Sequence, residues 1–314
     1  MRKIMFILAT LAFLGAANAG FIYLAPETAT QIAVDSERWR AGLVRKEIEL
    51  PDGLRYVYLE GGQGEPLLLL HGFGANKDNF VRVARDLTPH YRVIVPDHIG
   101  FGESAHPPEA DYGPKAQVER LRALLVALGI HSGTPVHIAG SSMGGQIALR
   151  YAAGHPGEVA SLWLLDPAGI WSAPPSELFK IVAANQRNPL MATNADEFAQ
   201  TFAFVMSDPP FIPRPMLNVM AQERIRNFTL EQRIFKEISA DSVEQAIAGL
   251  QTPSLIVFGA QDRVIPVPSA EILHKLLPNS QVAILPGIGH LPMLEQPKRC
   301  AEDYLRFRAA LAKR

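Results

Sequence analysis

The sequence has very little cysteine, because Cys300 is the only one in 314 residues. A single thiol cannot close an intrachain disulfide, and it cannot supply a zinc site built from clustered cysteines. The surrounding residues predict a C-terminal helix, in which we expect Cys300 to pack in the interior rather than act as a nucleophile. Disulfide scaffolds and cysteine-rich metal sites are therefore excluded.

Neither sign of charge dominates the sequence. It contains 30 Lys and Arg against 31 Asp and Glu, which gives a formal net charge of -1 at pH 7. There is also no long basic run, so the chain lacks the electrostatic footprint of a nucleic-acid-binding protein. No internal repeat or low-complexity tract is present. With 48% hydrophobic and 19% charged residues, the composition is typical of a globular protein with a large core.

Charge is missing altogether from the stretch between Lys3 and Glu27. Two interpretations of this apolar leader are open. The A-x-A sequence at 17–19 matches the cleavage site of a secretory signal peptide. The apolar run nevertheless continues beyond that site and is long enough to cross the ~30 Å hydrocarbon core as an uncleaved helix. We favour a membrane anchor over residues 1–26, with its two basic residues on the cytoplasmic side. Both interpretations export the domain that follows.

Short, continuously apolar runs recur along the chain and predict strands buried in a parallel sheet. Helical patterns lie between them; in residues 116–128, for example, the leucines mark one face. Strands that alternate with helices imply an α/β fold with a mostly parallel sheet covered by helices on both faces. The runs are PLLLL (66–70), RVIVP (92–96), PVHIA (135–139), SLWLL (161–165), SLIVF (254–258) and QVAIL (281–285).

The segment 170–240 breaks this alternation. It has no buried-strand run but has helical patterns, several phenylalanines and five prolines towards its middle. We therefore predict a helical cap inserted into an α/β core of residues 42–169 and 241–314. The apolar residues of the segment either pack a small core of its own or line an apolar substrate pocket, and the sequence leaves both interpretations open.

The stretch IAGSSMGGQIA places two adjacent serines inside a ring of glycines, between a predicted strand and a predicted helix. A sharp strand-to-helix turn crowds the residues two before and two after its apex, so both need to be glycine. Ser142 satisfies this condition with Gly140 and Gly144, whereas Ser141 would place the bulky Met143 at a crowded position. We therefore predict that Ser142 is a nucleophile; the alternative is a glycine-rich turn that only caps a helix.

A serine hydroxyl needs a base to take its proton, and the base needs a third group to orient it. Asp262 follows the predicted strand SLIVF, and His290 follows the next strand within the glycine-containing loop PGIGHLP. The other eight histidines lie in turns, on helix surfaces, in a strand or in loops where a structural role fits better. Asp166, which follows SLWLL, is the rival for the acid. We prefer Asp262 because its loop immediately precedes the unit that carries His290.

The negative charge of a tetrahedral intermediate also needs hydrogen-bond donors. The sequence His71-Gly72-Phe73-Gly74 follows the central strand PLLLL, and its glycines let the backbone approach a ligand closely. The backbone N–H groups of Phe73 and Met143 are our candidates for this oxyanion hole. An ordinary turn at residues 71–74 is the alternative.

These motifs resemble those of the α/β-hydrolase superfamily. The resemblance extends from about residue 42 to the C-terminus and rests on five spaced motifs; it is strongest to membrane-anchored bacterial lipases and esterases akin to monoacylglycerol lipases. One departure is visible in DHIGFGES (97–104), where relatives often have a proline after the second residue. The five motifs are LLLLHGFGANKDNF, VIVPDHIGFGES, IAGSSMGGQIALRYA, PSLIVFGAQDRVIPV and ILPGIGHLPMLEQP.

The resemblance implies the α/β-hydrolase fold, a catalytic triad of Ser142, Asp262 and His290, an oxyanion hole from Phe73 and Met143, and hydrolysis of carboxylic esters without a metal or an organic cofactor. Acylglycerols or other medium-chain esters are the expected substrates. The leader would anchor the enzyme in the inner membrane with its catalytic domain in the periplasm; cleavage would make it periplasmic or secreted.

Two alternatives to ester hydrolysis are open. A carbon–carbon hydrolase that acts on ring-cleavage products would use the same fold and triad, and its elbow can also read S-M-G-G. A non-enzymatic binding protein that retains the fold is the other alternative, although an intact triad argues against it. The pair Gly100-x-Gly102 lacks the third glycine and the helix start of a dinucleotide-binding loop, so we expect no nicotinamide or flavin site. The sequence gives no indication of an oligomeric state.

Overall fold

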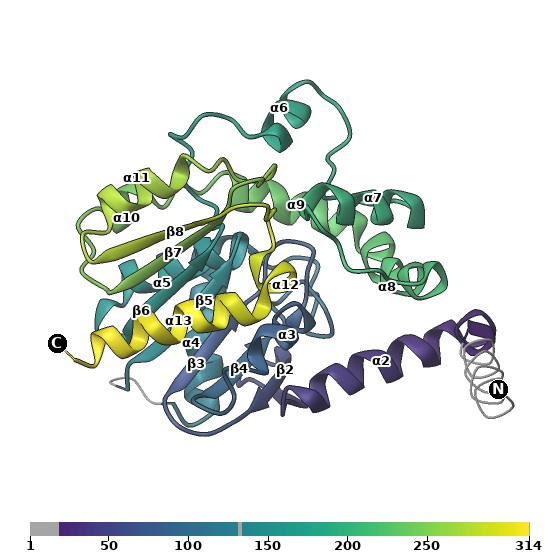
Figure 1. Ribbon diagram of the computed structural model, residues 1–314, viewed down its shortest axis with the longest axis horizontal. Helices are drawn as coiled ribbons and strands as arrows, with labels where there is room; N and C mark the ends of the chain where they lie inside the picture. Colours follow the sequence, from purple (N-terminus) through teal and green to yellow (C-terminus); the bar gives the residue numbers. More distant parts are fainter. Residues whose placement is uncertain (1–18, 131–133, 314) are drawn as a thin grey trace, which may run out of the picture.

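Figure 1 shows a computed structural model of the chain, which describes residues 19–130 and 134–313. An eight-stranded sheet lies at its centre, in the order β1-β2-β4-β3-β5-β6-β7-β8. The strands from β4 through β3 to β8 run parallel, and β2 pairs antiparallel with β1 and β4. The strands are β1 (Val44–Glu49), β2 (Arg55–Gly61), β3 (Pro66–Leu70), β4 (Arg92–Pro96), β5 (Val136–Ser141), β6 (Val159–Leu165), β7 (Ser254–Gly259) and β8 (Ser280–Leu285).

Helices cover both faces of the sheet, as the sequence predicts (Figure 1). Alternate residues of each central strand face opposite sides: Leu68 packs in the core under α4, α5 and α11, and Leu67 packs in the core under α3 and α13. Cys300 is buried in α13 within the second core. The predicted α/β-hydrolase architecture is therefore confirmed. The helices are α3 (Val81–Ala84), α4 (Pro114–Ala127), α5 (Met143–Gly154), α11 (Ser269–Leu276) and α13 (Pro297–Leu311).

All six predicted apolar runs form strands, but the last of them is less buried than its sequence suggests. β8 lies at the edge of the sheet, where Val282 and Ile284 remain about 40% exposed (39% and 41%). An apolar run is expected to be buried on both faces only where strands and helices surround it. The apolar run therefore predicts the strand correctly. It wrongly suggests that the strand is buried on both faces within the sheet, whereas β8 lies at the edge.

The segment 170–240 consists of helices joined by loops and contains no strand. It holds α6 (Glu177–Ala183), α7 (Ala195–Val205), α8 (Arg214–Arg226) and α9 (Phe228–Ser239), and α10 (Glu244–Ile247) follows it. The side chain of Asn194 caps α7 by accepting hydrogen bonds from two backbone N–H groups of the first turn, which defines where that helix begins. The shorter elements elsewhere are η1 (Lys77–Phe80), η2 (Pro156–Glu158) and α12 (Pro292–Glu295).

Helix α2 (Pro26–Arg40) precedes the sheet and connects two parts of the molecule that are distant in sequence. It packs against α8, which lies between α2 and α7 (Figure 1). Its buried Arg38 also donates two hydrogen bonds of 2.7 Å to the carboxylate of Asp78, in the loop after β3. This bidentate geometry is the strong form of an arginine–carboxylate pair.

A second ion pair lies in the interior near that loop. The ammonium group of Lys77 is buried and lies 2.8 Å from Oδ2 of Asp97, which is also buried. The half-exposed side chain of Glu103 contacts the same ammonium group at 2.8 Å. Burial alone would raise the pKa of the Glu103 carboxyl, but its hydrogen bonds to Arg45 and Lys77 lower that pKa to about 2. The loops after β3 and β4 are thereby held together at the edge of the sheet where the strands end.

No helix within residues 19–130 and 134–313 combines the length and the apolar character needed to cross a membrane. The predicted anchor over residues 1–26 falls mainly on residues 1–18, which lie outside the described part of the chain.

Candidate active site

Ser142 occupies the turn between β5 and α5, with φ 54° and ψ −117°. A non-glycine residue with positive φ is strained, and such strain persists only where the surrounding structure enforces it. A Cβ atom added to Gly140 would overlap the carbonyl oxygen of Gly144. The crowding that singled out Ser142 in the sequence is therefore present, and Ser142 is the apex of the turn.

The loop after β3 packs directly against this turn. A Cβ on Gly144 would overlap the carbonyl oxygen of Leu70, and a Cβ on Gly72 would lie 3.2 Å from the Cβ of Ser142. The two predicted oxyanion donors, Phe73 and Met143, thus belong to backbone segments that meet beside Ser142. Within the described part of the chain, neither backbone N–H donates a hydrogen bond, so both donors are available.

His290 and Asp262 form a hydrogen-bonded pair next to the same turn. Nδ1 of His290 lies 2.8 Å from Oδ2 of Asp262, while Oδ1 of Asp262 accepts hydrogen bonds from the backbone N–H groups of Val264 and Ile265. The side chain of Asp262 is fully buried, and that of His290 is 5% exposed. Because Nδ1 is hydrogen-bonded to Asp262, Nε2 is the ring nitrogen that can interact with groups in the cavity.

Ser142 and His290 line one cavity of about 520 Å³. The walls come from the loop after β3, from α2 through Val34, and mainly from the helical segment 170–240. The two interpretations of that segment's apolar residues both apply, because Phe198 packs in the segment's own small core and also lines the cavity. Other apolar residues of the wall are Phe202, Val205, Met206, Ile212 and Val219.

The helical segment reaches the histidine directly. The backbone N–H of His290 donates a 2.7 Å hydrogen bond to the carbonyl oxygen of Val205, at the end of α7. A Cβ on Gly289 would come within 3.0 Å of backbone atoms around Met206, so glycine is the residue that permits this close approach. The position of the imidazole is therefore coupled to the position of α7.

The imidazole of His290 is hydrogen-bonded to Asp262 and not to Asp166, the rival acid. Oδ1 of Asp166 accepts a hydrogen bond of 2.9 Å from the backbone N–H of Gly259. Burial, followed by the nearby carboxylate of Asp262, raises the pKa of Asp166 well above its ordinary value. Asp166, Asp262 and His290 each have a metal-ligating atom within 4.8 Å of the others. Nδ1 of His290 and Oδ2 of Asp262 are already hydrogen-bonded to each other, so we assign no metal to this cluster.

Arg224 is a residue of the site that the sequence does not reveal. This buried side chain of α8 donates hydrogen bonds to the carbonyl oxygens of Gly74 and Leu190, and its guanidinium lies 5.7 Å from the centre of the Phe73 ring. It pairs with the buried Glu231, whose pKa is raised by burial while the guanidinium opposes that rise. Arg224 therefore fixes the loop that carries Phe73, through contacts that no local motif encodes.

His71 and His98 form a buried pair in the loops after β3 and β4. The backbone N–H of His98 donates to Nε2 of His71 at 3.0 Å, so Nδ1 of His71 carries the proton and donates to the carbonyl oxygen of Gly72 at 2.8 Å. Burial lowers the pKa of both imidazoles. Their neutral rings support the loop that lies against Ser142, in keeping with the structural role predicted for them.

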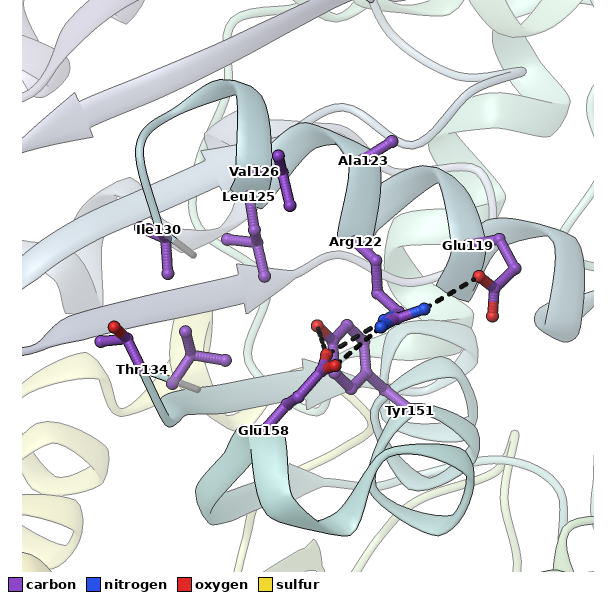
Figure 2. A pocket seen from close by; sticks show the side chains of 10 residues that line it. Glu119, Arg122, Ala123, Leu125, Val126, Ile130, Thr134, Tyr151 and Glu158 are labelled. Atoms are coloured by element: carbon purple, nitrogen blue, oxygen red, sulfur yellow. Dashed lines mark hydrogen bonds and ion pairs between the residues drawn. The ribbon is translucent and has the colours of Figure 1, made fainter. Parts of the chain in front are cut away.

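A second hollow, of about 340 Å³, is lined mainly by residues of α4, α5, β5 and η2, and Ser142 is not among them. Figure 2 shows the side chains that line it. Its charged groups are already paired: Arg122 Nη2 lies 2.7 Å from Glu158 Oε1, and Tyr151 donates to Glu158 at 2.9 Å. Glu119 contacts the same guanidinium at 3.3 Å. This hollow offers no free reactive group, and we therefore place the site at Ser142.

Comparison with known proteins agrees with this architecture. Residues 65–297 match the family model described as the alpha/beta hydrolase fold. The chain is 43% identical to Lipase 1 of Psychrobacter immobilis, over 90% of this chain and 89% of that protein. It is 28% identical to the human monoacylglycerol lipase ABHD6, over 82% of each chain. It also resembles the crystal structure of a membrane phospholipase A, described as a bacterial virulence factor, with 36% identity, a TM-score of 0.88 and full coverage of both chains.

The crowding around Gly144 predicts that alanine substitutions at the two ends of α5 have different effects on the free energy of unfolding. Gly144→Ala should lower the free energy of unfolding by about 2–3 kcal/mol or more, because the new methyl group meets backbone that cannot move aside. Gly154→Ala is the matched control at the other end of the helix, where nothing lies within 4 Å of an added Cβ. It should be neutral or slightly stabilising. Equal stability of the two variants in urea unfolding would contradict the described turn.

Proposed function

Because the chain belongs to the α/β-hydrolase family and is a carboxylic ester hydrolase, we propose that it cleaves lipid esters through an acyl-enzyme on Ser142. The observation that carries this proposal is the arrangement of three loops. Ser142 and His290 line one cavity, and Asp262 binds the far side of the imidazole at 2.8 Å. Nucleophile, base and orienting carboxylate thus come together from the ends of β5, β8 and β7.

In the proposed reaction, Nε2 of His290 takes the proton of the Ser142 hydroxyl as its oxygen attacks the acyl carbonyl. The carboxylate of Asp262 holds the ring with Nδ1–H directed towards it and stabilises the imidazolium that forms. His290 then returns the proton to the leaving alcohol. A water molecule, activated by the same histidine, releases the carboxylic acid and restores Ser142.

The developing oxyanion is proposed to accept hydrogen bonds from the backbone N–H groups of Phe73 and Met143. Met143 is the first residue of α5, where N–H groups have no partner within the helix and the helix dipole favours negative charge. Loss of one such donor typically costs a factor on the order of 10² to 10³ in turnover. No metal ion or organic cofactor takes part in this mechanism.

The cavity supports acylglycerols or other medium-chain esters as the substrate class. Apolar side chains form most of its wall, and its 520 Å³ can hold a substantial part of an acyl chain. We propose that the helical segment 170–240 acts as the cap that encloses this chain. Nothing in the site favours carbon–carbon cleavage over ester hydrolysis, and the lipases among the relatives favour the ester.

Replacing the nucleophile gives the first test. Ser142→Ala should lower the kcat/KM for p-nitrophenyl butyrate by a factor on the order of 10⁴ or more, with unchanged thermal unfolding. The adjacent Ser141→Ala is the matched control, because Ser141 is buried and its hydroxyl has no hydrogen-bond partner in the described part of the chain. Retained activity in Ser142→Ala, or equal losses in both variants, would refute the nucleophile.

The acyl-binding role of the cavity predicts a change in chain-length preference. Val219→Trp, on the half-buried cavity face of α8, should fill part of the cavity and reduce the kcat/KM for decanoyl esters by about tenfold or more relative to acetyl esters. Val44→Trp, on the exposed edge strand β1, is the control and should leave the ratio unchanged. A parallel loss on all chain lengths in Val219→Trp would argue against an acyl pocket at this position.

We also propose that residues 1–26 hold the enzyme at the outer face of the inner membrane. The apolar leader of the sequence and the resemblance to a membrane phospholipase A support this location. The native protein should then fractionate with membranes and retain Met1 on N-terminal analysis. A protein recovered from the soluble fraction with Gly20 at its N-terminus would show cleavage after Ala19 and contradict the anchor.

A further inference from the structure

A second carboxyl group lies next to the proposed triad, and the proposed mechanism does not use it. Asp166 follows β6 and is completely buried. Oxygen atoms of Asp166 and Asp262 lie with a ring nitrogen of His290 in one cluster, within 4.8 Å of one another. Asp166 also adopts a positive φ of 46°, which is uncommon outside glycine and marks a position that the surrounding structure enforces.

The hydrogen bonds of the two carboxyl groups are unequal. Asp262 accepts three, from the N–H groups of Val264 and Ile265 and from Nδ1 of His290. Asp166 accepts one, from Gly259 to its Oδ1. Its Oδ2 is buried and receives no donor within residues 19–130 and 134–313. Hydrogen bonds of this kind stabilise the charged form of a carboxyl group, so the negative charge belongs on Asp262.

Two buried carboxylates at this separation repel each other strongly, and one of them keeps its proton. A proton on Asp166 supplies the missing hydrogen bond, because the group can then donate to Asp262, whose carboxylate lies in the same cluster. The titratable groups that face Asp166 are Asp262, His290, Glu295 and Cys300. Glu295 adds further negative charge, and burial raises the pKa of Cys300 to about 12, so neither favours a second carboxylate at Asp166.

We propose that Asp166 is a positioning residue, held as a neutral carboxylic acid, which donates a hydrogen bond to Asp262 and thereby fixes the carboxylate that orients His290. This inference rests on the proposed function of Ser142, Asp262 and His290.

The arrangement has a consequence for the base. Two ionised carboxylates beside His290 would favour its imidazolium form, which cannot accept the proton of Ser142. If Asp166 is neutral and donates a hydrogen bond to Asp262, only one carboxylate orients the imidazole, and only one negative charge lies beside it. Asp166 therefore contributes the hydrogen bond without contributing the charge.

The pH dependence of kcat/KM for p-nitrophenyl butyrate separates the two charge states in the full-length enzyme. Asp166→Asn retains a donor and removes no charge if Asp166 is neutral, so its profile should superimpose on that of the native enzyme. Asp166→Ala removes the donor; kcat/KM should fall about 10- to 100-fold, and the ascending limb should move to higher pH, because an Asp262 carboxylate that lacks this donor stabilises the imidazolium form more strongly.

An ionised Asp166 gives the opposite result for the conservative variant. Removal of a negative charge in Asp166→Asn would destabilise the imidazolium form of the base and move the ascending limb down by about 1 pH unit or more. That shift would overturn the inference. So would equal activity losses in the Asn and Ala variants, since a donor would then have no value. Asp52→Asn, in an exposed turn, is the control for the substitution itself and should change nothing.

Infrared spectroscopy provides a readout that does not depend on activity. At neutral pH the native enzyme should show the C=O stretch of a protonated carboxylic acid, and Asp166→Asn should lose this band while Asp52→Asn keeps it. A band that survives in Asp166→Asn, or one that is absent from the native enzyme, would refute the assignment. These outcomes are distinct from failure of the proposed function, in which Ser142→Ala itself would retain hydrolysis.

Discussion

The strained turn at Ser142 is the constraint on which the rest of the site depends. A positive φ at a serine is unfavourable, and it is maintained because β5 and α5 are both anchored in the core and leave only a glycine-lined corner between them. That corner places Ser142 in the wall of the cavity and brings the backbone of Met143 next to it. It also favours glycine at position 72, where an added Cβ would lie only 3.2 Å from the Cβ of Ser142.

The parallel sheet explains how distant residues reach this hydroxyl. Parallel strands end at the same edge, so the loops after β6, β7 and β8 deliver Asp166, Asp262 and His290 to one place although they are far apart in sequence. The helical segment 170–240 then closes over the edge. Its contact with the site is specific, since α7 binds the backbone of His290 and α8 supplies Arg224 to the loop of Phe73.

Much of this architecture is predictable from sequence because it depends on local rules. Apolar runs predict the strands, and glycine spacing identifies Ser142 as the apex of its turn. The hydrogen bond between Asp262 and His290 matches the expected order of acid and base along the chain. The proximity of Asp166 to Asp262 and the contacts of Arg224 are not predictable in this way, because each joins segments from different parts of the chain through packing alone. The edge position of β8 is missed for the same reason.

We propose that His290, oriented by Asp262, makes the hydroxyl of Ser142 nucleophilic. Stoichiometric reaction with a fluorophosphonate, followed by mass spectrometry of the digested protein, tests this claim most directly. We expect one adduct per chain on the peptide that contains Ser142, and a labelling rate that falls steeply in His290→Ala. An adduct on another residue, or labelling at the native rate without the histidine, would contradict it.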